Sequence, residues 1–319
     1  RPIYDPNHLR KISCVSPAIS PVHDDFIAEI GDVDLASLEP GQIDEIKAAF
    51  WQYAVLVFPD QALTQKQHVA FAKNFGPMDH SVLKKAVADQ KLRVRDDIAD
   101  VSNLGPNNQI LAESNRLRRM QLGNRLWHTD SAFKYVPALA SLLYAREIPP
   151  VGGQTAFADL RAAYDALDDE TKARLQTLVA EHSLVYSRER MGYTDWQEGE
   201  RQAVDAVPQA MVRTVPQTGR KNLYVASHAG HIVGMDDAEA KPLIDALLAH
   251  ATQRQFTHVH RWRVGDLVMW DNRCTLHRGL PFDDLRFRRD VQRATVQDIA
   301  NSCEQEGLSP PDVHLRAAE

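Results

Sequence analysis

Three strand-like segments in the C-terminal third constrain the fold of this chain more than any other feature. They cover Gln255 to Arg263, Leu267 to His277 and Arg289 to Gln297. Helical patterns fall mainly in the first third and in scattered inserts between strands. This order differs from the regular strand–helix alternation of a parallel sheet. We therefore expect one α+β domain, residues 1–319, built around an antiparallel barrel or jelly roll.

Earlier segments predict the surrounding elements. Residues 41–54 place apolar side chains at helical spacing, and the buried strand of 54–58 follows directly. Thr64 and Gln67 form a capping-box pattern for a second helix, which ends before Gly76. Further helices are expected at 160–167, 169–180 and 236–250, a short strand at 154–158, and either a helix or a strand at 137–146.

Two segments have no clear periodicity. Residues 1–22 contain four prolines and are expected to wrap irregularly over the surface. The segment from about residue 80 to residue 124 is polar and charged, which predicts a long loop or a lid insertion over a site.

The charge balance excludes some classes of partner. The chain has 37 basic and 43 acidic residues, so its formal net charge of −6 gives no strong field for nucleic acid or an anionic membrane. Apolar runs stay far below the roughly 20 residues of a membrane span. Its cysteines, Cys14, Cys274 and Cys303, lack a CxxC spacing, which favours a reduced, cytoplasmic setting.

The 13 histidines include a candidate metal-binding pair, His128 and Asp130. On a strand these residues point to the same face, although a pair on the surface with no metal is the alternative. A second His-x-Asp pattern, His23 with Asp25, lies in the proline-rich leader. His277 ends a long apolar segment and offers a third ligand. Two histidines and one carboxylate on one face would form a facial triad with open coordination positions.

Two arginines follow the third ligand at strand spacing. Arg289 and Arg293 would share a face of the last strand and could both point into the barrel. Arginine pairs bidentately with carboxylates and stays charged, which suits a site for small organic acids. A solvated arginine-rich strand is the alternative.

Together these residues resemble the Fe(II)/2-oxoglutarate-dependent dioxygenases of the taurine dioxygenase and 2,4-dichlorophenoxyacetate dioxygenase superfamily. The resemblance runs from about Ile30 to Thr295 and is closest to the phenoxyacetate type. Its motifs are LVF at 56–58, FAKNFG at 71–76, LWHTDS at 126–131, PVGGQT at 150–155, FADLRAAYDAL at 157–167 and GDLVMWDNR at 265–273. The resemblance implies a double-stranded β-helix (jelly roll) core with flanking helices and a lid insertion.

The resemblance also implies roles by position. His128, Asp130 and His277 match the iron ligands. Thr155 and Arg289 match the residues that bind the distal carboxylate of 2-oxoglutarate, and Arg288 is an alternative to Arg289 because the interval from His277 looks one residue longer than expected. Arg293 matches the arginine near the anionic group of the substrate, and His228 and Lys84 match weaker substrate positions. For His228 a buried or surface structural role is the alternative, and for Lys84 a solvated side chain. A second lysine of the family falls at Val94.

The expected activity is that of an Fe(II)-, 2-oxoglutarate- and O2-dependent dioxygenase that releases succinate and CO2. The substrate would be a small anion, such as an aryloxyalkanoate, and hydroxylation next to its ether oxygen would cleave the ether. The resemblance also implies a homo-oligomer. A sulfonate or sulfate-ester dioxygenase, a non-catalytic barrel that binds small acids and a zinc hydrolase remain alternatives.

Overall fold

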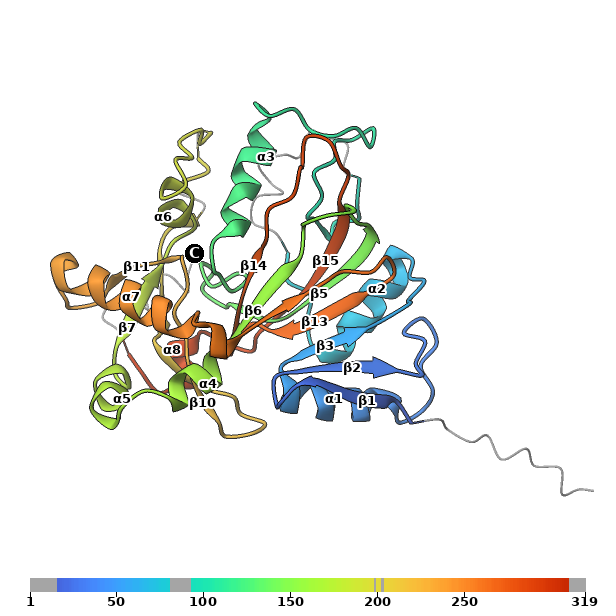
Figure 1. The fold of residues 1–319 in the computed structure, drawn as a ribbon. Helices are drawn as coiled ribbons and strands as arrows, with labels where there is room; N and C mark the ends of the chain where they lie inside the picture. The colour runs from blue at the N-terminus through green and yellow to red at the C-terminus, as the bar shows by residue number, and fades with distance from the viewer. Residues whose placement is uncertain (1–15, 81–92, 198, 202–203, 310–319) are drawn as a thin grey trace, which may run out of the picture.

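The structure is a computed structural model that describes residues 16–80, 93–197, 199–201 and 204–309, with two β-sheets at its centre (Figure 1). The larger sheet has seven strands in the order β1-β2-β3-β13-β5-β15-β4. In that order their bounds are Ala18–His23, Ile27–Gly31, Val55–Phe58, Leu267–Asp271, Ala138–Glu147, Asp290–Gln297 and Ala99–Asp100. Only β2 and β3 pair in parallel; the other neighbours pair antiparallel.

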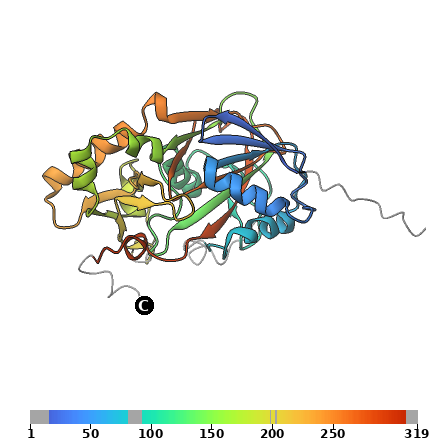
Figure 2. The same ribbon diagram turned by 90° about the horizontal axis from the view of Figure 1, so that it is seen from below.

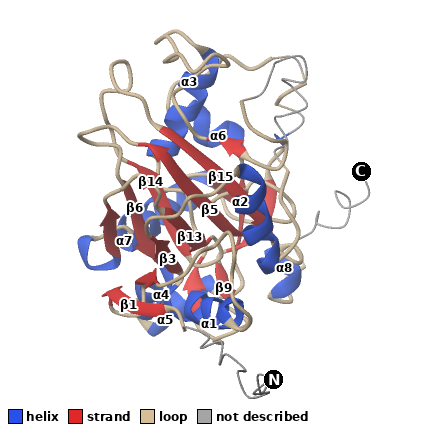
Figure 3. Cartoon of the chain, turned by 90° about the vertical axis from the view of Figure 1, so that its right-hand side faces the viewer, coloured by secondary structure: helices blue, strands red, loops and turns tan. Residues whose placement is uncertain are grey.

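A smaller antiparallel sheet faces the larger one (Figure 3). Its strands, in the order across the sheet, are β12 (Thr257–His260), β6 (Thr155–Asp159) and β14 (Thr275–Gly279). Phe157 of β6 joins Trp270 of β13 and Val291 of β15 in one buried cluster, which shows that the inner faces of the two sheets are packed together. The site described below lies between these faces.

Alternation along the central strands separates two cores. On β5, Leu142 and Tyr144 pack in the outer cluster, while Leu143 and Ala145 pack in the inner one. Successive side chains of a strand point to opposite faces, so each strand contributes to both layers. Helices α1 (Gln42–Tyr53) and α2 (Gln65–Ala72) cover the outer face, where they lie near the N-terminal strands in Figure 2.

A second lobe forms the left side of Figure 1 and has its own apolar cluster. Its strands form a three-stranded sheet, β11-β7-β8, and a separate β9–β10 pair. The bounds are Val179–His182 for β7, Val207–Ala210 for β8, Val212–Thr214 for β9, Lys221–Leu223 for β10 and Ala229–Ile232 for β11. The helices are α4 (Leu160–Asp165), α5 (Asp169–Leu175), α6 (Leu184–Glu189) and α7 (Asp237–Ala251).

Short helices complete the described chain: α3 (Arg116–Gln121), α8 (Ser302–Gln305), and the 3₁₀ turns Lys73–Phe75, Leu122–Arg125 and Arg254–Phe256. Among the described residues, no helix has the length and apolar character needed to cross a membrane. The α+β class expected from the sequence agrees with this mixture of helices and largely antiparallel strands.

Several local predictions are confirmed. The helix at 41–54 and the strand after it appear as α1 and β3. Residues 137–146, for which the sequence left helix and strand open, lie largely in strand β5. Thr64 and Gln67 make the reciprocal hydrogen bonds of a capping box at the start of α2. Local sequence chemistry was sufficient to predict these boundaries.

Three predictions were wrong in extent. Residues 1–22 were expected to be irregular, but Ala18–His23 form strand β1, where Pro21 is tolerated because β1 is an edge strand. The helix expected at 169–180 ends at Leu175, and the apolar residues after Leu178 instead pair as β7 with β8 and β11. Tertiary strand pairing outweighed the local helical pattern there.

The third error concerns the strand expected at 267–277. It is two strands, β13 and β14, which belong to different sheets. The break occurs because the Asp271 carboxylate accepts a hydrogen bond from the backbone N–H of Arg273, 2.9 Å away, and so stabilises a turn. The chain thereby crosses from the larger sheet to the smaller one and places His277 on the inner face.

Candidate metal centre and active site

Three side chains from distant segments meet at the edge of the smaller sheet. His277 lies on β14, and His128 pairs with it through two backbone hydrogen bonds of 3.0 and 2.8 Å. Asp130 follows in a turn, and the three potential ligand atoms all lie within 4.8 Å of one another. In the described part of the chain, this is the only such group of histidine, cysteine or acidic side chains. The structure thus brings together the three residues selected from the sequence.

The route to this convergence differs from the prediction. His128 and Asp130 were expected on a continuous strand, but His128 forms only an isolated bridge and a turn follows it. Ser131 has a positive φ of 56°, which marks the sharp change of direction. The turn, rather than strand alternation, aims the carboxylate at the two histidines.

Both imidazoles are held in the form that binds a metal. His128 Nδ1 lies 2.8 Å from the carbonyl oxygen of Leu126, so Nδ1 carries the hydrogen and Nε2 has a free lone pair. Burial lowers the pKa of His128 to about 4 and that of His277 well below its usual value. Both rings are therefore neutral at pH 7, and neutral imidazole is the ligand form.

The carboxylate of Asp130 stays ionised although it is buried. Burial alone would raise its pKa, but Arg293 and the two histidines outweigh burial and bring the pKa to about 2. Two neutral imidazoles and one carboxylate on one face fit a first-row ion such as Fe(II), with coordination positions left for other ligands. The donor set therefore matches the metal implied by the sequence.

A buried polar network fixes the carboxylate. Ser141 Oγ donates to Asp130 Oδ2 over 2.6 Å, and Asn272 Nδ2 donates to Ser141 Oγ over 2.9 Å. Asn272 Oδ1 also accepts from the Asp130 backbone N–H over 3.1 Å. Sequence reasoning included Asn272 in a motif but assigned it no role, and it missed Ser141. An amide directly after an apolar strand was the available signal for Asn272; nothing marked Ser141.

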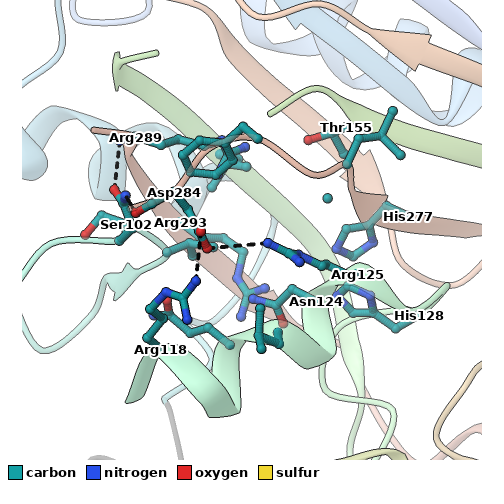
Figure 4. Close-up of a pocket in the computed structure, with 18 of the residues that line it drawn as sticks. Ser102, Arg118, Asn124, Arg125, His128, Thr155, His277, Asp284, Arg289 and Arg293 are labelled. Carbon is teal, nitrogen blue, oxygen red and sulfur yellow. Dashed lines mark hydrogen bonds and ion pairs between the residues drawn. The ribbon is translucent and has the colours of Figure 1, made fainter. Parts of the chain in front are cut away.

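A cavity extends from the histidines between the two sheets toward Arg289 (Figure 4). Leu143 and Trp270 form apolar parts of the cavity wall, and Thr155 and Arg289 line the same cavity. The Thr155 hydroxyl accepts from Trp262 Nε1 over 3.0 Å, so its own proton is free to donate. Trp262 was not selected from the sequence, and no motif marked it.

Arg289 is a buried cation without an acidic partner. It is 9% exposed, and among the described residues no carboxylate forms an ion pair with it. Its Nε donates to the Gly153 carbonyl over 3.2 Å, and burial lowers the pKa of its guanidinium to about 10. An uncompensated buried charge is costly, so the cavity is suited to an anion that pairs with it.

The structure distinguishes the two neighbouring arginines. Arg288 points outward, with a side chain 41% exposed and paired to Glu147 at 2.9 Å. Arg289 and Arg293 line the same cavity, and Val291 between them lies in the inner core. Arg289 lies just before β15, beyond a register shift between Asp290 and Val291, so regular strand alternation does not extend to it. Its place in the cavity lining nevertheless favours Arg289 over Arg288.

The remaining predicted residues have different outcomes. Arg293 lines the cavity and bonds to the Asp130 carboxylate. His228 is 1% exposed, lies 6.1 Å from His128 between ring centroids, and has no partner for either ring nitrogen in the described structure. Lys84 falls outside the described residues. Val94 packs in a small apolar cluster, so the chain has a core residue where the second family lysine was expected.

The described end of the expected lid segment borders the cavity. Arg118 of α3 and Arg125 bind the two oxygens of Asp284 at 2.8 and 3.4 Å, and all three residues line the cavity (Figure 4). Asn103 accepts from the backbone N–H of Arg289 over 2.8 Å. These residues were not selected from the sequence because their positions depend on how the loops meet.

Comparisons with known proteins agree with this arrangement. The family model described as "Taurine catabolism dioxygenase TauD, TfdA family" matches residues 18–295. The chain is 42% identical over 287 residues to an alpha-ketoglutarate-dependent 2,4-dichlorophenoxyacetate dioxygenase of Cupriavidus pinatubonensis, covering 90% of this chain and 99% of the relative. It is 40% identical over 279 residues to an (S)-phenoxypropionate/alpha-ketoglutarate-dioxygenase of Sphingobium herbicidovorans, covering 84% and 92%.

A solved structure is also similar to this chain in sequence and fold. The crystal structure of AAD-2 in complex with Mn(II) and N-oxalylglycine is 45% identical, with a TM-score of 0.82, and the match covers 90% of this chain and 99% of that one. The family match to residues 18–295 includes all three candidate ligands. The chain belongs to the TauD, TfdA family of dioxygenases.

Proposed function

We propose that this dioxygenase uses Fe(II), 2-oxoglutarate and O2 to hydroxylate aryloxyalkanoates at the carbon next to the ether oxygen. The observation that carries this proposal is the unpaired, buried Arg289 across one cavity from the three-ligand group. A dicarboxylate cosubstrate fits this arrangement, because one end can bind the metal and the carboxylate at the other end can pair with Arg289. The relatives named for 2,4-dichlorophenoxyacetate and phenoxypropionate support the substrate class.

Each group of residues has a separate task. His128, Asp130 and His277 would hold Fe(II), which would supply the oxidation chemistry. In the overall reaction, 2-oxoglutarate and O2 give succinate and CO2, and the remaining oxygen atom of O2 enters the substrate as the hydroxyl group. Arg289 forms the ion pair with the distal carboxylate of 2-oxoglutarate. The hydroxyl group of Thr155, whose proton is not used in its bond with Trp262, donates a hydrogen bond to the same carboxylate.

The substrate residues act by orientation. Arg293, on the inner face of β15, binds the substrate anion and so directs the adjacent carbon toward the metal. His228 is a candidate wall residue of the same site, and the role of Lys84 stays a prediction. When the carbon next to the ether oxygen gains a hydroxyl group, the product is a hemiacetal, which breaks down to a phenol and a carbonyl acid.

The architecture supports the finer fold assignment. We infer that the two facing sheets form the double-stranded β-helix (jelly roll) core of a single domain, because Phe157, Trp270 and Val291 pack between them. A homo-oligomeric, cytoplasmic enzyme remains our expectation from the family resemblance.

The decisive experiment measures O2 consumption and succinate release by purified protein with Fe(II) and 2-oxoglutarate. We expect phenoxyacetate and 2-phenoxypropionate to stimulate both, with release of one phenol per succinate. The His128→Ala variant should abolish the reaction and the weak visible charge-transfer band of the anaerobic complex. A wild-type protein that shows the band but is not stimulated by any aryloxy acid would contradict the substrate class.

A sulfonate or sulfate-ester dioxygenase is the second candidate. The guanidinium of Arg293 can bind a sulfonate as well as a carboxylate, and a taurine dioxygenase of Burkholderia xenovorans is 29% identical with a TM-score of 0.71. Taurine and alkyl sulfates therefore belong in the same screen. If wild-type protein neither forms the band nor consumes O2, the chain is instead a non-catalytic barrel.

A further inference from the structure

Arg188 is a buried cation that the proposed function leaves without a task. It lies on the short helix α6 and is 8% exposed. It is one of the five arginines that are buried in the described structure: Arg161, Arg188, Arg213, Arg273 and Arg289. Three of the five form ion pairs with an aspartate, at 2.9, 2.6 and 2.7 Å. The two that do not are Arg188 and Arg289.

The contacts of Arg188 are all with neutral groups. Its Nη1 donates to Ser187 Oγ over 3.2 Å, and its Nη2 lies 3.5 Å from Asn124 Oδ1. Its Nε has no partner among the described residues. Burial lowers the pKa of its guanidinium to about 10, yet the group remains charged at pH 7. A charge in this setting calls for an anion that is supplied from outside the described fold.

Arg188 lies directly behind the wall of the cavity. Its Nη2 is 3.5 Å from Oδ1 of Asn124, and Asn124 lines the cavity together with His128 and Arg293. In keeping with this position, the charge of Arg188 contributes to the lowered pKa values of His128 and His228. Asp130, the acidic group of that neighbourhood, is already bonded to Arg293. The anion for Arg188 is therefore not provided by the metal ligands.

A glycine makes room for this cation. A Cβ atom at Gly123 would overlap the guanidinium carbon and two guanidinium nitrogens of Arg188, so the planar group lies directly against the backbone. Gly123 has an ordinary φ, and the need for glycine here is therefore spatial. The next residue, Asn124, lines the cavity that contains His128 and Arg293.

We propose that Arg188 is a second arginine of the substrate-anion site, which binds the carboxylate of the aryloxyalkanoate together with Arg293. Arg188 approaches from α6 of the second lobe and Arg293 from β15 of the larger sheet. A carboxylate has two oxygens and can accept from both guanidiniums at once. This inference rests on the proposed function and makes Arg188 a determinant of selectivity for charged over neutral aryloxy compounds.

The main test compares Arg188→Gln with the wild-type enzyme. The KM for phenoxyacetate should rise about 10- to 100-fold, the loss expected for one hydrogen bond to a charged group. The preference for phenoxyacetate over its uncharged amide should fall by the same factor. The dissociation constant for 2-oxoglutarate, measured from the anaerobic charge-transfer band, should stay within about twofold, because Arg289 is unchanged.

Two further variants separate binding from structure. Gly123→Ala keeps Arg188 but displaces its guanidinium, so it should raise the same KM without affecting 2-oxoglutarate. Arg190→Gln is the matched control on the same stretch of chain, where the side chain is 39% exposed and paired with Asp245; its kinetics should equal those of wild type.

The outcomes distinguish this inference from the proposed function. If wild-type protein oxidises phenoxyacetate but Arg188→Gln and Gly123→Ala keep its KM, the inference is wrong and the function stands. If both variants weaken 2-oxoglutarate and phenoxyacetate equally, Arg188 has only a structural role, and the inference is again wrong. If Arg188→Gln does not fold, Gly123→Ala and Arg188→Lys decide, since an unchanged substrate KM in both overturns it.

Discussion

Replacing Arg289 by glutamine should weaken 2-oxoglutarate binding, whereas the same change at Arg288 should not. Arg289 is 9% exposed and has no acidic partner among the described residues, so a bound carboxylate would complete a desolvated ion pair. Removing one partner of such a pair costs about 3 kcal/mol or more. At 1.4 kcal/mol per factor of ten, the dissociation constant should rise roughly a hundredfold.

The neighbouring residue is a close control. Arg288→Gln removes an equal charge one position away, but that side chain is 41% exposed and its partner, Glu147, is 46% exposed. Exposed ion pairs contribute little, and neither Arg288 nor Glu147 lines this cavity. Its 2-oxoglutarate affinity should match that of wild type within about twofold.

The assay is an anaerobic titration of Fe(II)-loaded protein with 2-oxoglutarate, followed by the visible charge-transfer band. Arg289→Lys adds a further check, since it keeps the charge but loses the bidentate geometry and should fall between the other variants. The reasoning would be refuted if Arg288→Gln lost affinity while Arg289→Gln kept it. That result would mean that the segment just before β15 presents Arg288, rather than Arg289, to the cavity.

Three other outcomes are expected. Ser141→Ala removes the hydrogen bond to the Asp130 carboxylate and should weaken Fe(II) binding about tenfold or more in a metal titration, with little change in the fold. Thr155→Val should raise the dissociation constant of 2-oxoglutarate about tenfold, and an unchanged constant would exclude its hydroxyl from the site. Burial lowers the pKa of His68 to about 4, despite the hydrogen bond to Leu142, so the folded state excludes a proton that the unfolded chain binds below 6.5. The free energy of unfolding should therefore fall as the pH drops from 6.5 to 4, by up to about 1.4 kcal/mol per pH unit, and chemical denaturation of His68→Gln should show a shallower decline.

The parts of the site that could be predicted from sequence are those with local or periodic causes. The inward direction of Val291 and Arg293 follows from the two-residue period of a strand, which the paired register of β15 with β5 preserves between Val291 and Val296. Arg289 precedes this stretch and a register shift, so its place in the cavity lining does not follow from the period alone. The capping box at Thr64 is likewise a local interaction. Such features do not depend on which distant segment lies opposite.

Features that depend on distant partners could not be predicted in this way. The break between β13 and β14 after Asp271 depends on a hydrogen bond from the backbone N–H of Arg273 to the Asp271 carboxylate, which lies at the end of an otherwise apolar segment. Ser141 gained its role only because β5 lies beside β13, so that Asn272 and Asp130 could both reach its hydroxyl. The partners of Arg188 likewise follow from how α6 meets the turn that contains Gly123.

The hydrogen-bonded pairing of His128 with His277 also ties metal affinity to the global folding equilibrium. The two residues are far apart in the chain and become neighbours only when β14 has paired with the segment around His128. An unfolded chain therefore has no comparable site, and any ion that binds the native state shifts the equilibrium toward it. At a free concentration of one hundred times the dissociation constant, this linkage adds about 2.7 kcal/mol to the free energy of unfolding. The cofactor thus also acts as a non-covalent cross-link between two remote stretches of chain.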